Sequence, residues 1–98
     1  MSKERVPVLP ASCIYHDREK YTIELELPGS SGEDIDLEMT KSTFCLKSPR
    51  NDVEYFGCWV LAHEIDPNKA KATFKNGLLT VTAPLAKPFK GTKVKIEH

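Results

Sequence analysis

The pair Asn76-Gly77 constrains the fold of this chain more than any other feature, because it separates two runs of strand-forming residues. A two-residue type I′ turn requires positive φ at both central positions, which asparagine tolerates and glycine adopts freely. Alternation after the turn places three apolar side chains on one face of a strand: Leu79, Val81 and Ala83. The stretch from residue 72 to residue 84 therefore predicts a β-hairpin.

Length and composition indicate one small globular domain. The chain has 98 residues, of which 40% are hydrophobic, and its 14 basic and 14 acidic residues balance. Zero net charge gives no general attraction to nucleic acid or to an anionic membrane, so we expect neither as a partner. The sequence has no bilayer-length apolar stretch and no signal-peptide pattern at its N-terminus, so we expect a cytoplasmic protein.

Alternating apolar and polar residues predict further strands along the chain. Their ranges are 12–15, 21–27, 35–39, 43–47 and 58–65. Residues 48–57 contain Pro49 and are expected to form a polar connection. The segment from Cys58 to Ile65 is apolar on both faces, which predicts a central strand. No helical periodicity of useful length is present, so we predict an all-β, immunoglobulin-like antiparallel sandwich of about seven strands.

The cysteines and histidines do not predict a chemical site. Cys13, Cys45 and Cys58 are an odd number without a CxxC pair, so we expect reduced thiols and no disulfide framework. His16 and His63 each lie at odd spacing from the nearest cysteine, which places the partners on opposite faces of a strand and excludes a nucleophile–base dyad. Paired zinc-ligand spacing and phosphate-binding loops are absent from the sequence. We therefore expect no metal, no cofactor and no enzymatic activity.

The closing hairpin resembles the signature near the end of the α-crystallin domain of small heat-shock proteins. The matching residues are Ala72, Asn76, Gly77, Leu79, Val81 and Pro84. Two earlier segments are also similar: residues 21–29, which end in Leu-Pro-Gly, and residues 33–37, which begin with acidic residues. Val94-Lys95-Ile96 stands where the family carries its C-terminal Ile-x-Ile/Val motif. The likeness covers about residues 11–96, and the chain is identified as a minimal microbial member with a short N-terminal arm.

The resemblance implies an organisation and a function. It divides the chain into an extended arm at residues 1–10, a β-sandwich domain at 11–85 and a C-terminal tail at 86–98. It implies an ATP-independent holdase chaperone that binds unfolding client proteins and forms a homodimer or a larger homo-oligomer. A CS-domain-like adaptor that binds one specific folded partner has a similar fold and stays open as the alternative.

The resemblance also implies a docking site for the tail. Val94 and Ile96 are two residues apart, so on an extended tail they face the same way. The implied receptor is a groove on a neighbouring subunit, beside an edge strand. The candidate groove residues are Ile35, Leu37, Met39, Ala72 and Phe74. The alternatives are an edge strand within the same chain and a tail that stays undocked.

Charge favours the same arrangement, since residues 21–40 contain six acidic residues and no basic one, whereas the tail is rich in lysine. We hypothesise that Lys93 and Lys95 meet Asp36 and Glu38 of the partner, although two separately solvated faces would explain the same pattern. Trp59, the only tryptophan, is expected to anchor the core, with a dimer or client contact as the alternative.

Overall fold

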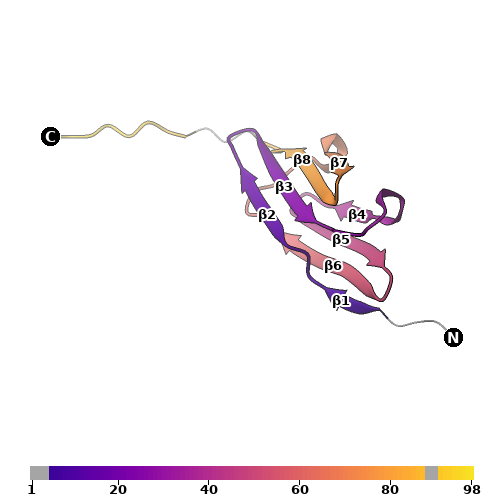
Figure 1. The fold of residues 1–98 in the computed structure, drawn as a ribbon. Coiled ribbons are helices and arrows are strands. Elements are labelled where there is room, and N and C mark those ends of the chain that lie inside the picture. The colour runs from indigo at the N-terminus through magenta and orange to yellow at the C-terminus, as the bar shows by residue number, and fades with distance from the viewer. Residues whose placement is uncertain (1–4, 88–90) are drawn as a thin grey trace.

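The chain folds into two four-stranded β-sheets packed face to face, as the computed structural model of residues 5–87 and 91–98 shows (Figure 1). The first sheet has the order β1-β6-β5-β4, with bounds Val6–Val8, Val53–Val60, Thr43–Arg50 and Asp36–Met39. The second has the order β2-β3-β8-β7, with bounds Ser12–His16, Lys20–Glu26, Leu78–Pro84 and Lys71–Lys75. Two short 3-10 helices complete the described elements, η1 at Gly32–Asp34 and η2 at Pro67–Lys69. All strand pairs are antiparallel except β1 with β6, so the predicted sandwich is confirmed.

The core lies between the sheets and consists of the side chains that the alternating patterns point inward. Its fully buried members include Ile23, Leu25 and Leu27 from β3 and the residue after it, Phe44 and Leu46 from β5, and Val81 from β8. Alternate positions on these strands face outward and are more exposed. Among the described residues, no helix has the length and apolar character that crossing a bilayer requires.

The hairpin formed by β7 and β8 has the turn that the sequence predicts. Both central residues have positive φ, 52° at Asn76 and 79° at Gly77. The turn packs against the end of β3, where the Leu27 N–H donates to the Gly77 carbonyl oxygen at 2.7 Å. The Asn-Gly turn and the Leu-Pro-Gly segment, both of which resemble family motifs, are therefore neighbours in space.

The predicted polar connection at residues 48–57 is wrong. β5 continues to Arg50, a tight turn at Asn51 and Asp52 reverses the chain, and β6 begins at Val53. Pro49 is tolerated within β5 because β4 pairs with β5 only as far as Lys47, so beyond that point β5 has a neighbour on one side alone.

The central strand predicted at residues 58–65 is displaced. β6 ends at Val60, whose side chain is 83% exposed. Leu61 and Ile65 are buried, but they belong to a loop that crosses one end of the sandwich. Their backbone N–H groups donate to the carbonyl oxygens of Ser42 and Lys41, each at 2.7 Å. The apolar pattern therefore reflects burial of a loop and not a strand with two covered faces.

The expectation of reduced thiols is wrong for two of the three cysteines. Cys45 and Cys58 form a disulfide between β5 and β6, with their Cα atoms 4.1 Å apart. They stand directly opposite each other because the turn at residues 51–52 sets the register of the hairpin. Cys13 is free and exposed.

The two ends of the chain differ in structure. Residues 6–8, expected as part of an extended arm, form β1, which pairs in parallel with β6. Residues 91–98 are exposed, contain no helix or strand, and run away from the sandwich (Figure 1). The expected arm also includes residues 1–4, and the expected tail includes residues 88–90, all of which lie outside the described residues.

A candidate docking groove between the sheet edges

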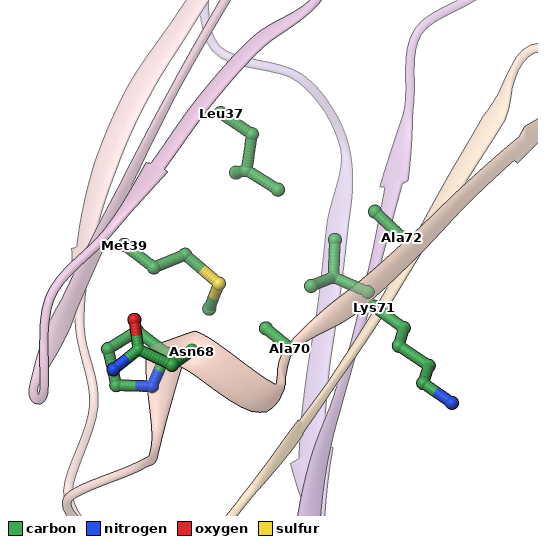
Figure 2. Close-up of a pocket in the computed structure, with 8 residues that line it drawn as sticks. Leu37, Met39, Asn68, Ala70, Lys71 and Ala72 are labelled. Atoms are coloured by element: carbon green, nitrogen blue, oxygen red, sulfur yellow. The ribbon is translucent and has the colours of Figure 1, made fainter.

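A groove of about 310 Å³ lies between β4 and β7, each the last strand of its sheet. Because both strands are edges on the same side of the sandwich, the inner faces of the two sheets are accessible between them. Figure 2 shows the residues that line it. They are Leu37, Met39, Pro67, Asn68, Ala70, Lys71, Ala72 and Val81.

Most side chains that line the groove are apolar, with Asn68 and Lys71 as the polar exceptions. Leu37 and Met39, two residues apart on β4, are half-buried and point across the groove toward Ala70 and Ala72 (Figure 2). The side chains of Ala72 on β7 and of Ala70 just before it are short, so this wall leaves space in front of the longer β4 side chains. Lys71 extends away from the groove (Figure 2). The arrangement suits a pair of aliphatic side chains presented at strand spacing.

The short helix η2 forms one end of the groove and is held in place by its capping interactions. The Asp66 carboxylate accepts a hydrogen bond from the Asn68 N–H at 3.1 Å, and Pro67 occupies the first turn. The Asp66 N–H donates to the Pro84 carbonyl oxygen at 2.9 Å, which fixes η2 beside the end of β8. Pro67, Asn68 and Ala70 line the groove but were not predicted from the sequence, although Asp-Pro-Asn is a helix-start pattern.

The structure brings together three of the five predicted groove residues, Leu37, Met39 and Ala72. Ile35 and Phe74 are not among the lining residues, and both pack against the core. Phe74 lies opposite Leu79 in the register and close to Gly32, where an added Cβ would stand 3.4 Å from the phenylalanine ring.

The acidic side chains of β4 lie on the other face of that strand. Asp36 and Glu38 alternate with Leu37 and Met39, and both are exposed on the outer face of the first sheet. The apolar pair of the tail is also exposed, with 81% of the Val94 side chain and 80% of Ile96 accessible. One chain thus carries an apolar groove flanked by acidic groups and, separately, an exposed apolar pair flanked by lysines.

Comparison with known proteins identifies the family. The model of the Hsp20/alpha crystallin family matches residues 13–97, most of the chain. The chain belongs to this family. A 15 kDa heat shock protein of Leptospira interrogans is 29% identical over 101 residues, covering 88% of this chain and 78% of that protein. This membership suggests a chaperone role, since the family consists of small heat-shock chaperones that generally are not enzymes.

Solved structures of other proteins share the fold. Heat shock protein 16.0 from Schizosaccharomyces pombe superposes with a TM-score of 0.77 at 20% identity, covering 92% of this chain and 99% of that one. A nuclear movement protein from E. cuniculi also superposes, with a TM-score of 0.58 at 13% identity over 87% of this chain and 98% of that one. At these identities the likeness concerns the fold alone, so the sandwich by itself does not separate the chaperone from an adaptor.

The residues predicted to match the family signature lie in the hairpin of β7 and β8. Asn76 and Gly77 form the turn, Leu79 and Val81 are buried in the core, and Pro84 is the last residue of β8. Ala72 lies opposite Val81 in the register and lines the groove. These positions therefore shape both the core and the wall of the groove.

Trp59 packs against the core, as expected for an anchor. Its ring stacks on Phe44, the residue opposite it in the register, with centroids 4.8 Å apart and planes inclined by 13°. The side chain is only half-buried, and a dimer or client contact at its exposed part stays a prediction. Leu9 and Trp59 both lie against Gly57, where an added Cβ would approach their side chains to 2.8 and 2.6 Å.

His16 and His63, each close to a cysteine in the sequence, lie next to each other in the structure. The rings of His16 and His63 are 4.8 Å apart in an edge-on arrangement, with Tyr21 beside them. The Tyr21 hydroxyl oxygen accepts a hydrogen bond from the backbone N–H of His63 at 3.1 Å. Within residues 5–87 and 91–98, no group of three or more His, Cys, Asp or Glu side chains is arranged to hold a metal ion.

Proposed function

We propose that this protein is a cytoplasmic, ATP-independent holdase that binds unfolding proteins without catalysing a reaction and without a cofactor. The observation that carries the proposal is the apolar groove between β4 and β7 in a chain of the Hsp20 family whose own tail exposes Val94 and Ile96. In this proposal residues 1–10 act as an arm, 11–85 as the structural domain and 86–98 as the docking tail. Subunits assemble when the tail of one occupies the groove of another.

The strand geometry supports a specific mode of docking. β4 pairs with β5 on one side only, so its other edge can accept a further strand. A tail segment added there would place Val94 and Ile96 on the face of Leu37 and Met39, inside the groove. Its alternate residues, including Lys93, would then lie on the outer face.

The same alternation brings opposite charges together. On the outer face, Lys93 and Lys95 of the tail would stand beside Asp36 and Glu38 of the receiving subunit. Because both acidic side chains are exposed, these pairs contribute little affinity and mainly favour one register of the docked strand.

Energetics limit a single docking event. Burying two aliphatic side chains contributes about 3–6 kcal/mol. Loss of rigid-body freedom and ordering of the tail cost several kcal/mol of that gain. One tail in one groove is therefore weak, and assembly requires several such contacts at once. Weak docking also suits a holdase, because grooves can open when clients present apolar segments.

The experiment that tests the proposal combines an aggregation assay with a measurement of mass. A thermally unfolding enzyme is heated with and without the protein, while size-exclusion chromatography with light scattering follows the oligomer. We expect suppression of aggregation by the wild type, and smaller oligomers after deletion of residues 93–98 or after Val94→Ser with Ile96→Ser. Glu97→Gln is the matched tail control and should behave as the wild type. A strictly monomeric wild type that suppresses no aggregation in several-fold excess would exclude the holdase.

A second candidate is an adaptor of the CS-domain type. The specific observation in its favour is the fold likeness to the nuclear movement protein from E. cuniculi. An adaptor would bind one folded partner as a monomer and leave the aggregation of unrelated enzymes unchanged. The assay described above therefore separates the two functions without knowledge of the partner.

A further inference from the structure

The disulfide between Cys45 and Cys58 lies on the outer face of the first sheet, away from the core. Their neighbours along the strands, including Leu46 and Gly57, face inward and are buried, whereas Cys45 is half-buried and Cys58 is exposed. The position makes the bond accessible to molecules in solution. Accessible disulfides exchange with free thiols far more readily than bonds enclosed in a core.

The disulfide adds little to the connectivity of the fold. A disulfide stabilises mainly by restricting the unfolded chain, and the effect grows with the length of the closed loop. Here the two cysteines are separated by only 13 residues, within a hairpin already joined by its turn and by register pairs from Thr43 with Val60 to Arg50 with Val53. The backbone pairing and the buried face of β5 and β6 remain when the bond opens, so we expect a folded reduced protein.

A shallow cavity of about 160 Å³ borders the disulfide on the side of β4. It is lined by Asp36, Glu38, Cys45, Leu46, Lys47 and Phe56. The cavity thus offers two carboxylates, one ammonium group and an exposed aromatic ring beside a sulfur atom. A molecule that carries both an ammonium and a carboxylate group complements these charges, and a thiol on that molecule would lie near Cys45.

We propose that the Cys45–Cys58 disulfide is a reversible redox site, opened by a small zwitterionic thiol that binds in the cavity beside Cys45. Disulfides that occur in reducing compartments are mostly redox-active, which fits the cytoplasmic location proposed above. The chemistry is independent of holdase activity, so either proposal can fail without the other.

The exchange proceeds in two balanced steps. The thiolate of the bound molecule attacks Cys45 Sγ, the sulfur that borders the cavity. The Cys45–Cys58 bond breaks, and Cys58 leaves as a thiolate that takes a proton from water. Exposure of Cys58 to solvent favours it as the leaving group. A second thiol then attacks the sulfur of the bound molecule, which releases Cys45 as a thiol and the small molecule as its disulfide. Two electrons pass from the two small thiols to the protein, and the small-molecule disulfide reverses the reaction.

The test compares two thiols on folded protein. Oxidised Cys13→Ser protein, which keeps the redox pair as its only cysteines, is treated with cysteine or with uncharged 2-mercaptoethanol. Alkylation and mass spectrometry then follow opening of the bond, while circular dichroism follows the fold. We expect both thiols to open the disulfide in the folded protein. Each rate is divided by the rate at which the same thiol reduces a small model disulfide.

Variants then locate the binding site. Lys47→Met and Glu38→Gln should each slow opening by cysteine about two- to fivefold, as expected for exposed charge contacts, and leave 2-mercaptoethanol unaffected. Lys75→Met, on the other sheet, is the control and should change neither rate. In Cys58→Ser protein, cystine should form a mixed disulfide on Cys45.

Three results would overturn the inference. The disulfide could open only when the protein unfolds in denaturant, or the strand signal in circular dichroism could be lost on reduction; either would make the bond purely structural. Equal slowing of both thiols by Lys47→Met would remove the cavity from the reaction.

Discussion

The two sides of the sandwich, where the edge strands of the sheets face each other, are covered in different ways. On the side of β1 and β2, the chain itself crosses between the sheets. Leu9 lies against Gly57, Pro10 is buried, and the Ala11 carbonyl oxygen accepts a hydrogen bond from the Glu26 N–H at 2.9 Å. On the side of β4 and β7, the connection from β3 to β4 places Gly32 against Phe74, η2 forms one end of the opening, and a groove remains.

The difference places the residues that stabilise the fold and the residues available to bind another segment on opposite sides of the sandwich. A covalent crossover covers its side at a low entropic cost, because its ends are already held in the two sheets. On the groove side the crossing segments leave the space between Leu37, Met39 and Ala72 accessible, so a cover there must come from a segment that docks from elsewhere. Substitutions on the first side should therefore change unfolding, and substitutions on the second should change assembly.

The largest effect is expected on the crossover side. Gly57→Val places a side chain where Trp59 and Leu9 already lie, and overpacking of this kind costs about 1–3 kcal/mol. In a domain of this size each kcal/mol lowers Tm by about 4–8 °C. Thermal unfolding followed by circular dichroism measures the shift, with Thr73→Val on an outer face as the control. An unchanged Tm would mean that the crossover does not close this side tightly.

On the groove side, Ala72→Glu should weaken assembly without weakening the fold. Ala72 is exposed and faces the space between β4 and β7, so a carboxylate there conflicts with an apolar occupant. We expect smaller oligomers by light scattering and a free energy of unfolding within about 0.5 kcal/mol of the wild type. Thr73→Glu puts the same charge on the opposite face of β7 and is the matched control. Equal effects of the two substitutions would argue against docking in the groove.

Charge reversal in the tail should have a smaller effect on the same side. Lys93→Glu with Lys95→Glu replaces the proposed attraction to Asp36 and Glu38 by repulsion, worth less than about 1 kcal/mol per exposed pair. The oligomer distribution should shift at low salt and recover at high salt. Reversing the charge of both acidic residues as well should restore assembly. Unchanged oligomers at low salt would contradict the proposed pairing.

The smallest effect concerns the turn between β2 and β3, next to the crossover side. The backbone N–H groups of Glu19 and Lys20 donate to the Asp17 carboxylate at 2.7 and 2.8 Å and lower the pKa of that group from its usual 3.8. A depressed pKa contributes stability above the unfolded value, and the contribution is lost as pH falls through the folded value. Asp17→Asn should thus lower Tm slightly at neutral pH and leave it unchanged in strong acid. A difference that persists in acid would indicate a cause other than charge.

Local chemistry in the sequence is enough to predict several elements. The turn at Asn76-Gly77 follows from the backbone preferences of two adjacent residues. The inward faces of β3 and β8 follow from period-two alternation, which directly reflects burial of one face. Leu37, Met39 and Ala72 were also predicted as groove residues, but only the family resemblance indicated that β4 and β7 would face each other.

Other features depend on register, which single-residue patterns do not encode. Pro49 suggested a break, yet the strand continues because its far side has no partner at that point. The disulfide follows from the turn at residues 51–52, which places Cys45 opposite Cys58. The absence of a CxxC spacing carries no information about such a cross-strand pair.

The strands with one buried face and the Asn76-Gly77 turn can be predicted from the sequence because they depend on short-range chemistry, and the family can be predicted from the residues of that turn and its strands. Which strands form the edges of the sheets, and hence where the groove lies, depends on how the two sheets pack. The tertiary structure also placed η2 at the end of the groove and joined two cysteines across a hairpin. These features arise from contacts between residues far apart in the chain, and such contacts are fixed only when the two sheets pack.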